Sequence, residues 1–94
     1  MILIFIKVDV VEGKEAEFER LVAQVAEQSL NNETGCHQYN LCKTTEHHNY
    51  VIIEKYENEA ALEEHRNKDY FQEAGPKLRE CIEGTQRHMM NVLV

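Results

Sequence analysis

The sequence is short of basic residues. It has ten lysines and arginines against 17 aspartates and glutamates, which gives a formal net charge of −7 with neutral histidines. The few cations are scattered along the chain, so they form no basic stripe that could neutralise phosphates. This balance argues against a nucleic-acid partner and against binding to an anionic membrane surface.

Proline, low-complexity tracts and long apolar runs are also scarce. One proline and 43% hydrophobic residues in a 94-residue chain predict a single globular domain over residues 1–94. The opening stretch MILIFIKVDV is too short to cross a bilayer and soon carries Lys7 and Asp9. It has no cationic leader, and three cysteines cannot all pair within one chain. These features predict a soluble cytoplasmic protein with reduced thiols.

Hydrophobic periodicity predicts the order of the elements. Alternating β-branched and aromatic residues indicate strands, and apolar residues at helical spacing, from Phe18 to Ser29, indicate a long helix. Asn58 and Asp69 are suitable N-caps for two later helices, and Pro76 suits the first turn of a third. The predicted strands span residues 2–10, 36–44, 50–57 and 85–94, and the predicted helices span residues 14–32, 59–67, 69–75 and 76–83.

This β-α-β-β-α-β order, with the second helical segment broken, predicts a ferredoxin-like α+β fold with four antiparallel strands and helices on one face. In the second strand, Tyr39 and Leu41 are expected on one face, with Cys36 and Cys42 on the other. Tyr39, Leu41, Ile52 and the methionines of the tail would leave the face without helices too apolar to remain exposed. We therefore predict a homodimer that packs sheet to sheet.

The segment GCHQYNL, residues 35–41, suggests a reactive thiol or a metal site, but its spacing favours neither. Neighbours on a strand point to opposite faces, so Cys36 and His37 cannot form a thiolate–imidazolium pair, and Cys36 is expected to be a small core residue. The chain has no CxxC motif and no two histidines at i, i+4 on one helix. His47 and His48 fall in a predicted loop, where exposure is the ordinary expectation. We predict no metal site.

His65 is the main catalytic candidate. It follows Leu62 by three positions, so it lies on the buried edge of the predicted helix and can reach the sheet. Glu54 occupies the middle of the apolar strand VIIEKY, where a buried carboxylate needs a partner. A Glu54–His65 hydrogen bond would satisfy both groups. It would serve as a structural lock between helix and sheet, or it would orient His65 as a base, and the two roles are compatible.

Four segments in this order resemble the antibiotic biosynthesis monooxygenase (ABM) family, closest to its quinol-oxidising branch: GKEAEFERL, NETGCHQY, YVIIEKYENEAALEEH and YFQEAGPKL. The resemblance covers nearly the whole chain and implies a dimeric α+β barrel. It also implies a pocket between the sheet and the broken helices, and oxidation of quinols or aromatic polyketides by O₂ without a metal or flavin. Related haem-degrading proteins use a tryptophan near the position of His65, and this chain has no tryptophan.

The remaining site candidates are aromatic or polar. The resemblance places Tyr39 and Tyr70 near the cavity, and Phe71 is expected to anchor the short helix, although core packing would also explain each aromatic residue. The weaker candidates for substrate binding are Asn40, Arg66 and His88, of which Arg66 could instead face solvent and His88 could line the dimer seam.

Two classes of function follow. In the first, a cofactor-free monooxygenase uses His65 as a base, Glu54 to orient it, and Tyr39 and Tyr70 to position a small electron-rich aromatic that reacts with O₂. The alternatives are a non-oxidative isomerase of a small carbonyl compound, using the same proton-transfer groups, or a ligand-binding dimer with no catalysis. A phosphorylated substrate would need several convergent cations, and only Arg66, Lys68 and Arg87 are available.

Overall fold

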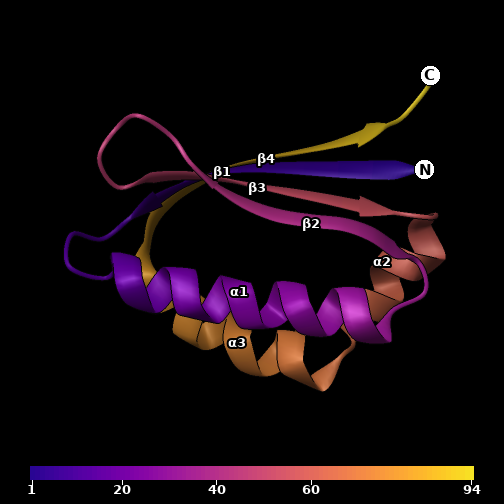
Figure 1. Ribbon diagram of the computed structural model, residues 1–94, viewed down its shortest axis with the longest axis horizontal. Coiled ribbons are helices and arrows are strands. Elements are labelled where there is room, and N and C mark those ends of the chain that lie inside the picture. Colours follow the sequence, from indigo (N-terminus) through magenta and orange to yellow (C-terminus); the bar gives the residue numbers. More distant parts are fainter.

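The computed structural model describes residues 1–94 and has four strands and three helices (Figure 1). In chain order they are β1 (Ile2–Val10), α1 (Glu15–Asn32), β2 (Cys36–Lys43), β3 (Asn49–Tyr56), α2 (Glu59–Arg66), α3 (Asp69–Cys81) and β4 (Ile82–Asn91). The strands form one antiparallel sheet in the order β2-β3-β1-β4. This arrangement confirms the predicted ferredoxin-like α+β fold.

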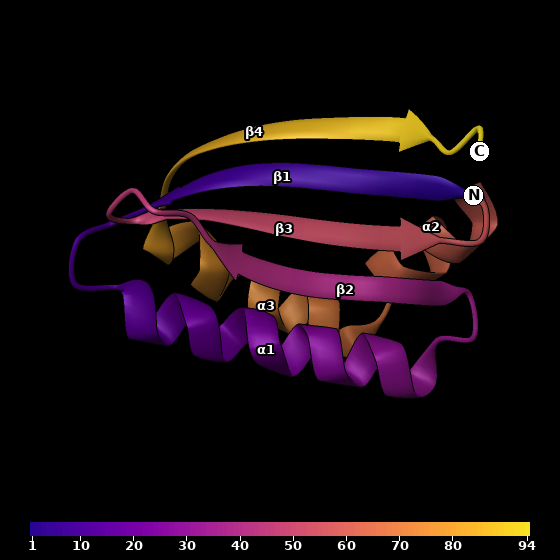
Figure 2. The same ribbon diagram turned by 45° about the horizontal axis from the view of Figure 1, so that its top comes forward.

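The helices cover one face of the sheet only (Figures 1 and 2). The predicted apolar stripe of α1 is buried: its residues are Phe18, Leu21, Val22, Val25 and Ser29. Helix α2 begins as predicted, because the side chain of Asn58 accepts a hydrogen bond from the backbone N–H of Ala61 at 2.9 Å. None of the helices is both long and apolar enough to span a membrane.

The prediction of two short helices over residues 69–75 and 76–83 was wrong. The chain instead forms the single helix α3, with Pro76 inside it, and Asp69 is its first residue rather than a capping residue. Proline removes one backbone hydrogen bond from a helix interior. Ala74 and Cys81, on either side of Pro76, are both buried, so packing of the helix on the rest of the fold offsets that loss.

The last strand also differs from its prediction. β4 begins at Ile82, before Gly84, and ends at Asn91, three residues short of the C-terminus. Its pairing with β1 shifts register between Asp9 and Val10, so Glu83 is an extra residue in β4 at a β-bulge. The bulge lets strand pairing start directly after α3.

A second bulge corrects the predicted faces of β2. The pairing of β2 with β3 shifts between Cys36 and Gln38, so Cys36 and Tyr39 both point toward the helices and are buried. Cys42 is exposed on the opposite face, so the two cysteines do not share a face as predicted. A bulge of one residue reverses the alternation on one side of it.

Most of the residues used to predict the dimer point the other way, and Met90 alone lies on the face without helices. Tyr39, Leu41 and Ile52 face the helices, since Tyr39 pairs with the buried Glu54 and Leu41 with the buried Ile52. The face without helices is nevertheless partly apolar. We call it the open face, and its apolar residues are Leu3, Phe5, Val51, Ile53 and Met90.

Candidate active site

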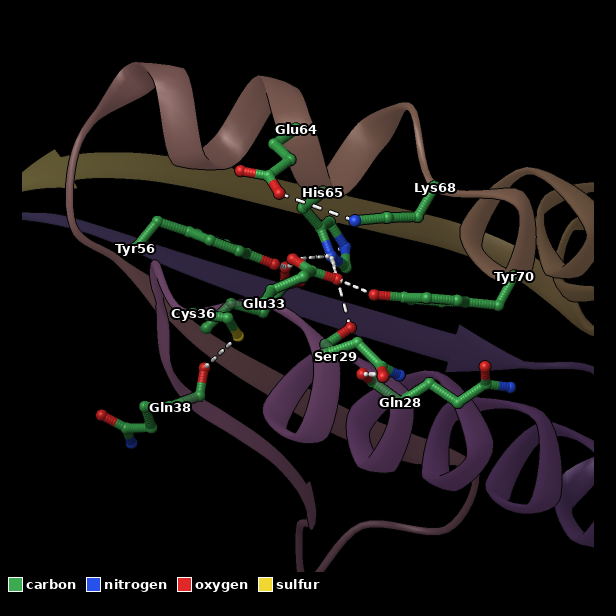
Figure 3. Close-up of polar contacts among 12 residues, drawn as sticks. Gln28, Ser29, Glu33, Cys36, Gln38, Tyr56, Glu64, His65, Lys68 and Tyr70 are labelled. Atoms are coloured by element: carbon green, nitrogen blue, oxygen red, sulfur yellow. Dashed lines mark hydrogen bonds and ion pairs between the residues drawn. The ribbon is translucent and has the colours of Figure 1, made fainter.

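His65 lies in the last turn of α2, is 1% exposed, and points into the space between α2, α1 and the sheet (Figure 3). Its Nδ1 atom lies 3.1 Å from both carboxylate oxygens of Glu33 and 3.3 Å from the hydroxyl of Ser29. Since a carboxylate only accepts hydrogen bonds, Nδ1 carries a hydrogen and donates a hydrogen bond to Glu33. In the neutral form of the ring, the lone pair is then on Nε2.

Glu33 is a site residue that was not predicted from the sequence. It follows α1 as its C-cap residue, is 5% exposed, and also accepts a hydrogen bond from the hydroxyl of Tyr70 (Figure 3). One signal was available, because Val25, Ser29 and Glu33 are spaced four residues apart and continue the buried stripe of α1. A carboxylate at the end of a buried stripe needs partners from other elements, and His65 and Tyr70 supply them.

The predicted hydrogen bond between Glu54 and His65 is absent. Oε1 of Glu54 lies 4.0 Å from Nε2 of His65, which has no hydrogen-bond partner and is shielded from solvent. The carboxyl group accepts a 2.6 Å hydrogen bond from Tyr56 instead. Burial raises the pKa of Glu54, while the Tyr56 hydrogen bond and the charges of His65, Arg87 and Arg66 oppose that shift.

Three aromatic rings surround the imidazole. Ring centroids of Phe71, Tyr56 and Tyr39 lie 4.7, 5.2 and 5.9 Å from that of His65. Burial, with the nearby charges of Glu54 and Cys36, raises the pKa of the Tyr39 hydroxyl well above its usual value. Tyr39 is therefore neutral at physiological pH. The three aromatic residues around His65 form an apolar environment apart from the hydroxyl groups of the two tyrosines.

A small cavity of about 110 Å³ lies against His65 and Glu54. Two arginines, Arg66 from α2 and Arg87 from β4, line it together with these two residues. Its other lining residues are apolar: Ile4, Ile6, Leu62 and Phe71. The cavity therefore combines a buried base, a buried acid, two cations and an apolar wall.

The structure separates some of the predicted site residues. Phe71 and Arg66 line the cavity, but Tyr39 and Tyr70 do not, and Tyr70 lines another small cavity between α1 and α3. Asn40 and His88 point to the open face, where Asn40 accepts a hydrogen bond from Gln38 and the ring of His88 lies 6.3 Å from that of Phe5. Strand alternation places both on the side opposite His65.

Two other features do not offer comparable chemistry. Cys36 is 6% exposed, and burial raises the pKa of its thiol to about 11, so the thiolate needed for nucleophilic attack is scarce. The largest cavity, about 550 Å³, lies at the hairpin end of the sheet beside Asp9 and Tyr50, and neither His65 nor Glu33 lines it. The His65 cavity is therefore the candidate active site.

Comparison with known proteins agrees with this fold. The model of the antibiotic biosynthesis monooxygenase (ABM) family matches residues 1–77. A protein of Caulobacter crescentus CB15, provisionally named an antibiotic biosynthesis monooxygenase, is 29% identical, with a TM-score of 0.93 over 99% of this chain and 90% of that chain. A conserved protein from Methanosarcina mazei Go1 is 28% identical, with a TM-score of 0.87 over 95% of this chain and 89% of that one.

A more distant structure shares the fold alone. A Nitrosomonas europaea protein with the same provisional name is 16% identical, with a TM-score of 0.91 and complete coverage of both chains. No curated protein matches the sequence. Because the family model matches most of the 94 residues and the four-stranded fold agrees throughout, the chain belongs to the antibiotic biosynthesis monooxygenase family.

Proposed function

We propose that this protein is a cofactor-independent monooxygenase that oxidises a small electron-rich aromatic, a quinol or polyketide-like phenol, with O₂. The observation that carries the proposal is the state of His65. Its Nδ1 is held by Glu33, and its Nε2 is unpartnered, buried, and belongs to a ring that lines the cavity. Such a nitrogen is oriented to accept a proton from a bound substrate.

In the proposed reaction, the phenolic hydroxyl of the substrate gives its proton to Nε2 of His65. The charge on the resulting imidazolium is stabilised by Glu33 at Nδ1 and by Glu54, whose Oε1 lies 4.0 Å from Nε2. Arg66 and Arg87 line the same cavity and would stabilise the substrate anion. These groups account for deprotonation without any step that needs a metal.

The substrate anion is the electron donor to O₂. In a quinol, one oxygen atom of O₂ becomes a hydroxyl group on a ring carbon that carried one hydrogen. The other oxygen atom leaves as water with two hydrogens of the substrate, and the ring is released as a hydroxyquinone. The organic substrate supplies all the electrons, so no external reductant is required. The water-excluded, aromatic-lined surroundings of His65 favour this chemistry, because the anion is protected from reprotonation.

The size of the cavity limits the substrate. At about 110 Å³ it is smaller than the roughly 300–1,000 Å³ of typical ligand pockets. It would accept a small compound or one ring of a larger one. A homodimer formed through the open face is part of the proposal, with the five apolar residues of that face at its centre.

The test uses metal-stripped protein and a panel of hydroquinones, with O₂ consumption followed under air and substrate conversion followed under nitrogen. The decisive variant is His65→Asn, because its amide can still donate to Glu33 while Nε2 is lost. We expect turnover to fall by about 10²- to 10⁴-fold, the usual contribution of a general base. His37→Asn is the control, since His37 is exposed and contacts Glu57 instead. Full activity in His65→Asn would contradict the proposal.

The small cavity and its two arginines also favour a second candidate, a non-oxidative isomerase of a small carbonyl compound. Its proton would move through the same nitrogen of His65. Conversion that proceeds equally under nitrogen, and is lost in His65→Asn, would support this candidate. If ligands bind the unmodified protein and His65→Asn with equal affinity, and neither protein converts any compound, the chain is a binding protein.

A further inference from the structure

A second cluster of titratable side chains lies far from His65, where the loop between β1 and α1 meets the β2–β3 hairpin. Figure 2 shows both loops at the same end of the sheet. Glu12 comes from the first loop, and His47 and His48 come from the hairpin. One ligand atom from each of these three side chains lies within 4.8 Å of the other two. Two imidazoles and one carboxylate at this spacing are a set that Zn²⁺ binds in proteins.

The backbone of His48 explains why adjacent histidines can act together. His48 has φ = 67°, in the left-handed region that non-glycine residues rarely adopt. On an extended strand the two side chains would diverge, but here the ring centroids of His47 and His48 are 3.6 Å apart. The carbonyl of His48 accepts a 2.9 Å hydrogen bond from the N–H of Val10, which fixes the turn against the end of β1.

A carboxylate supports the ring of His48 from behind. Nδ1 of His48 is in ion-pair contact with Oε2 of Glu15, is shielded from solvent, and makes no hydrogen bond. The other oxygen of Glu15 accepts a 2.7 Å hydrogen bond from the N–H of Gly13, which has φ = 91°, a conformation that glycine adopts without strain. In metal sites, a carboxylate in this position commonly orients the ring by accepting a hydrogen bond from its second N–H, and here the carboxylate of Glu15 is already in contact with Nδ1. Nε2 of His48 is then the nitrogen with a free lone pair.

The geometry points to a binding site for a divalent transition-metal ion, with Zn²⁺ as its natural probe, formed by Glu12, His47 and His48. Glu15 is a positioning residue for His48. Glu12 and His47 are exposed, so the ion can enter from solvent, and water would complete a tetrahedral shell. No metal site was predicted because no single helix, strand or loop contains the residue spacing of a known metal-binding motif. The proposed ligands come from two loops that only the folded chain brings together.

The experiment titrates the full-length, metal-free protein with Zn²⁺ by calorimetry and with Co²⁺ by visible absorption, where a tetrahedral site gives an intense d–d band. We expect one ion per chain. His47→Gln and His48→Asn should abolish binding, and asparagine is chosen at His48 because it tolerates the left-handed backbone. Glu15→Gln should bind roughly 10- to 100-fold more weakly, since it removes the charge behind His48 while leaving the three ligands intact.

Two control variants identify adventitious binding. His37→Gln removes an exposed histidine elsewhere, and Cys42→Ser removes the exposed thiol. Both should bind Zn²⁺ like the unmodified protein. Far-UV circular dichroism checks the fold of each variant. If a histidine variant unfolds, Glu12→Gln tests the site instead, because it alters an exposed side chain and should weaken Zn²⁺ binding. Absence of binding, or binding that Glu12→Gln and His47→Gln leave unchanged, would overturn the proposal.

Discussion

Glu54 illustrates how a single buried carboxyl group ties stability to pH. It is 6% exposed, burial raises its pKa, and its hydrogen bond to Tyr56 opposes the shift without cancelling it. Between the ordinary glutamate pKa and this raised value, the folded state binds more protons at Glu54 than the unfolded state does. The contribution of Glu54 to stability therefore falls as pH rises through that window.

Replacing Glu54 with glutamine should remove this pH dependence. The amide oxygen of Glu54→Gln can still accept the hydrogen bond from Tyr56, so the main change is the loss of the ionisable group. We expect the variant to gain free energy of unfolding relative to the unmodified protein as pH rises through the window, and to gain least at the acidic end. Urea unfolding from roughly pH 4 to pH 8 measures the difference.

The matched control for this experiment is Glu63→Gln, on the exposed side of α2. Its stability should follow that of the unmodified protein across the same range. If Glu54→Gln is destabilised more strongly at high pH than at low pH, then Glu54 is stabilised as a carboxylate by its neighbours, and our account of the pKa shift is wrong.

At the scale of elements, the site depends on how closely α2 approaches the turn that joins α1 to β2. Gly35 lies in this turn, and a Cβ atom added there would lie 2.5 Å from the Cβ of Ala61 in α2. The carbonyl of Gly35 also accepts a 2.8 Å hydrogen bond from Glu57, just before α2. This close approach of the backbone holds His65 of α2 over Glu33 at the end of α1.

Gly35→Ala should therefore destabilise the protein by about 1–3 kcal/mol, the usual cost of overpacking. Ala61→Gly removes the clashing methyl group, although it costs about 1 kcal/mol of helix propensity by itself. The double variant should lose less free energy of unfolding than the sum of the losses of the two single variants. A double-mutant cycle by urea unfolding would detect that coupling.

Gly75→Ala is the control for glycine replacement. The atom nearest to an added Cβ there is the guanidinium of Arg79 at 3.4 Å, and the position lies inside α3. Alanine should be neutral or stabilising at that position, because it improves helix propensity. Equal effects of Gly35→Ala and Gly75→Ala would show that the contact with Ala61 does not constrain α2.

At the scale of the whole molecule, the sheet has one face covered by helices and one without them (Figure 2). Leu3, Phe5, Val51 and Ile53 of the open face come from the two central strands and are only partly exposed within the single chain. A second copy packed against this face would remove their remaining apolar surface from water. The open face therefore remains the predicted dimer interface, but of the residues that predicted it from the sequence only Met90 lies there.

Ile53→Glu should convert the protein to monomers. Ile53 lies in the middle of β3 on the open face, and two copies of the substitution would place unpaired carboxylates in a desolvated interface. Sedimentation equilibrium should give twice the chain mass of 11.0 kDa for the unmodified protein and the chain mass for the variant. Leu30→Glu, at an equally apolar but 47% exposed position on α1, should stay dimeric. A monomeric unmodified protein would refute the interface.

The sequence by itself determined the class of fold, the amphipathic stripe of α1, the cap at Asn58 and the burial of His65, since each depends on spacing within one element. Only the tertiary structure decided the partners. His65 meets Glu33, 32 residues away, rather than forming the predicted hydrogen bond to Glu54, and Cys36 faces the helices because of a bulge. Local periodicity fixes which face a side chain occupies, whereas register shifts and loop packing fix what it contacts.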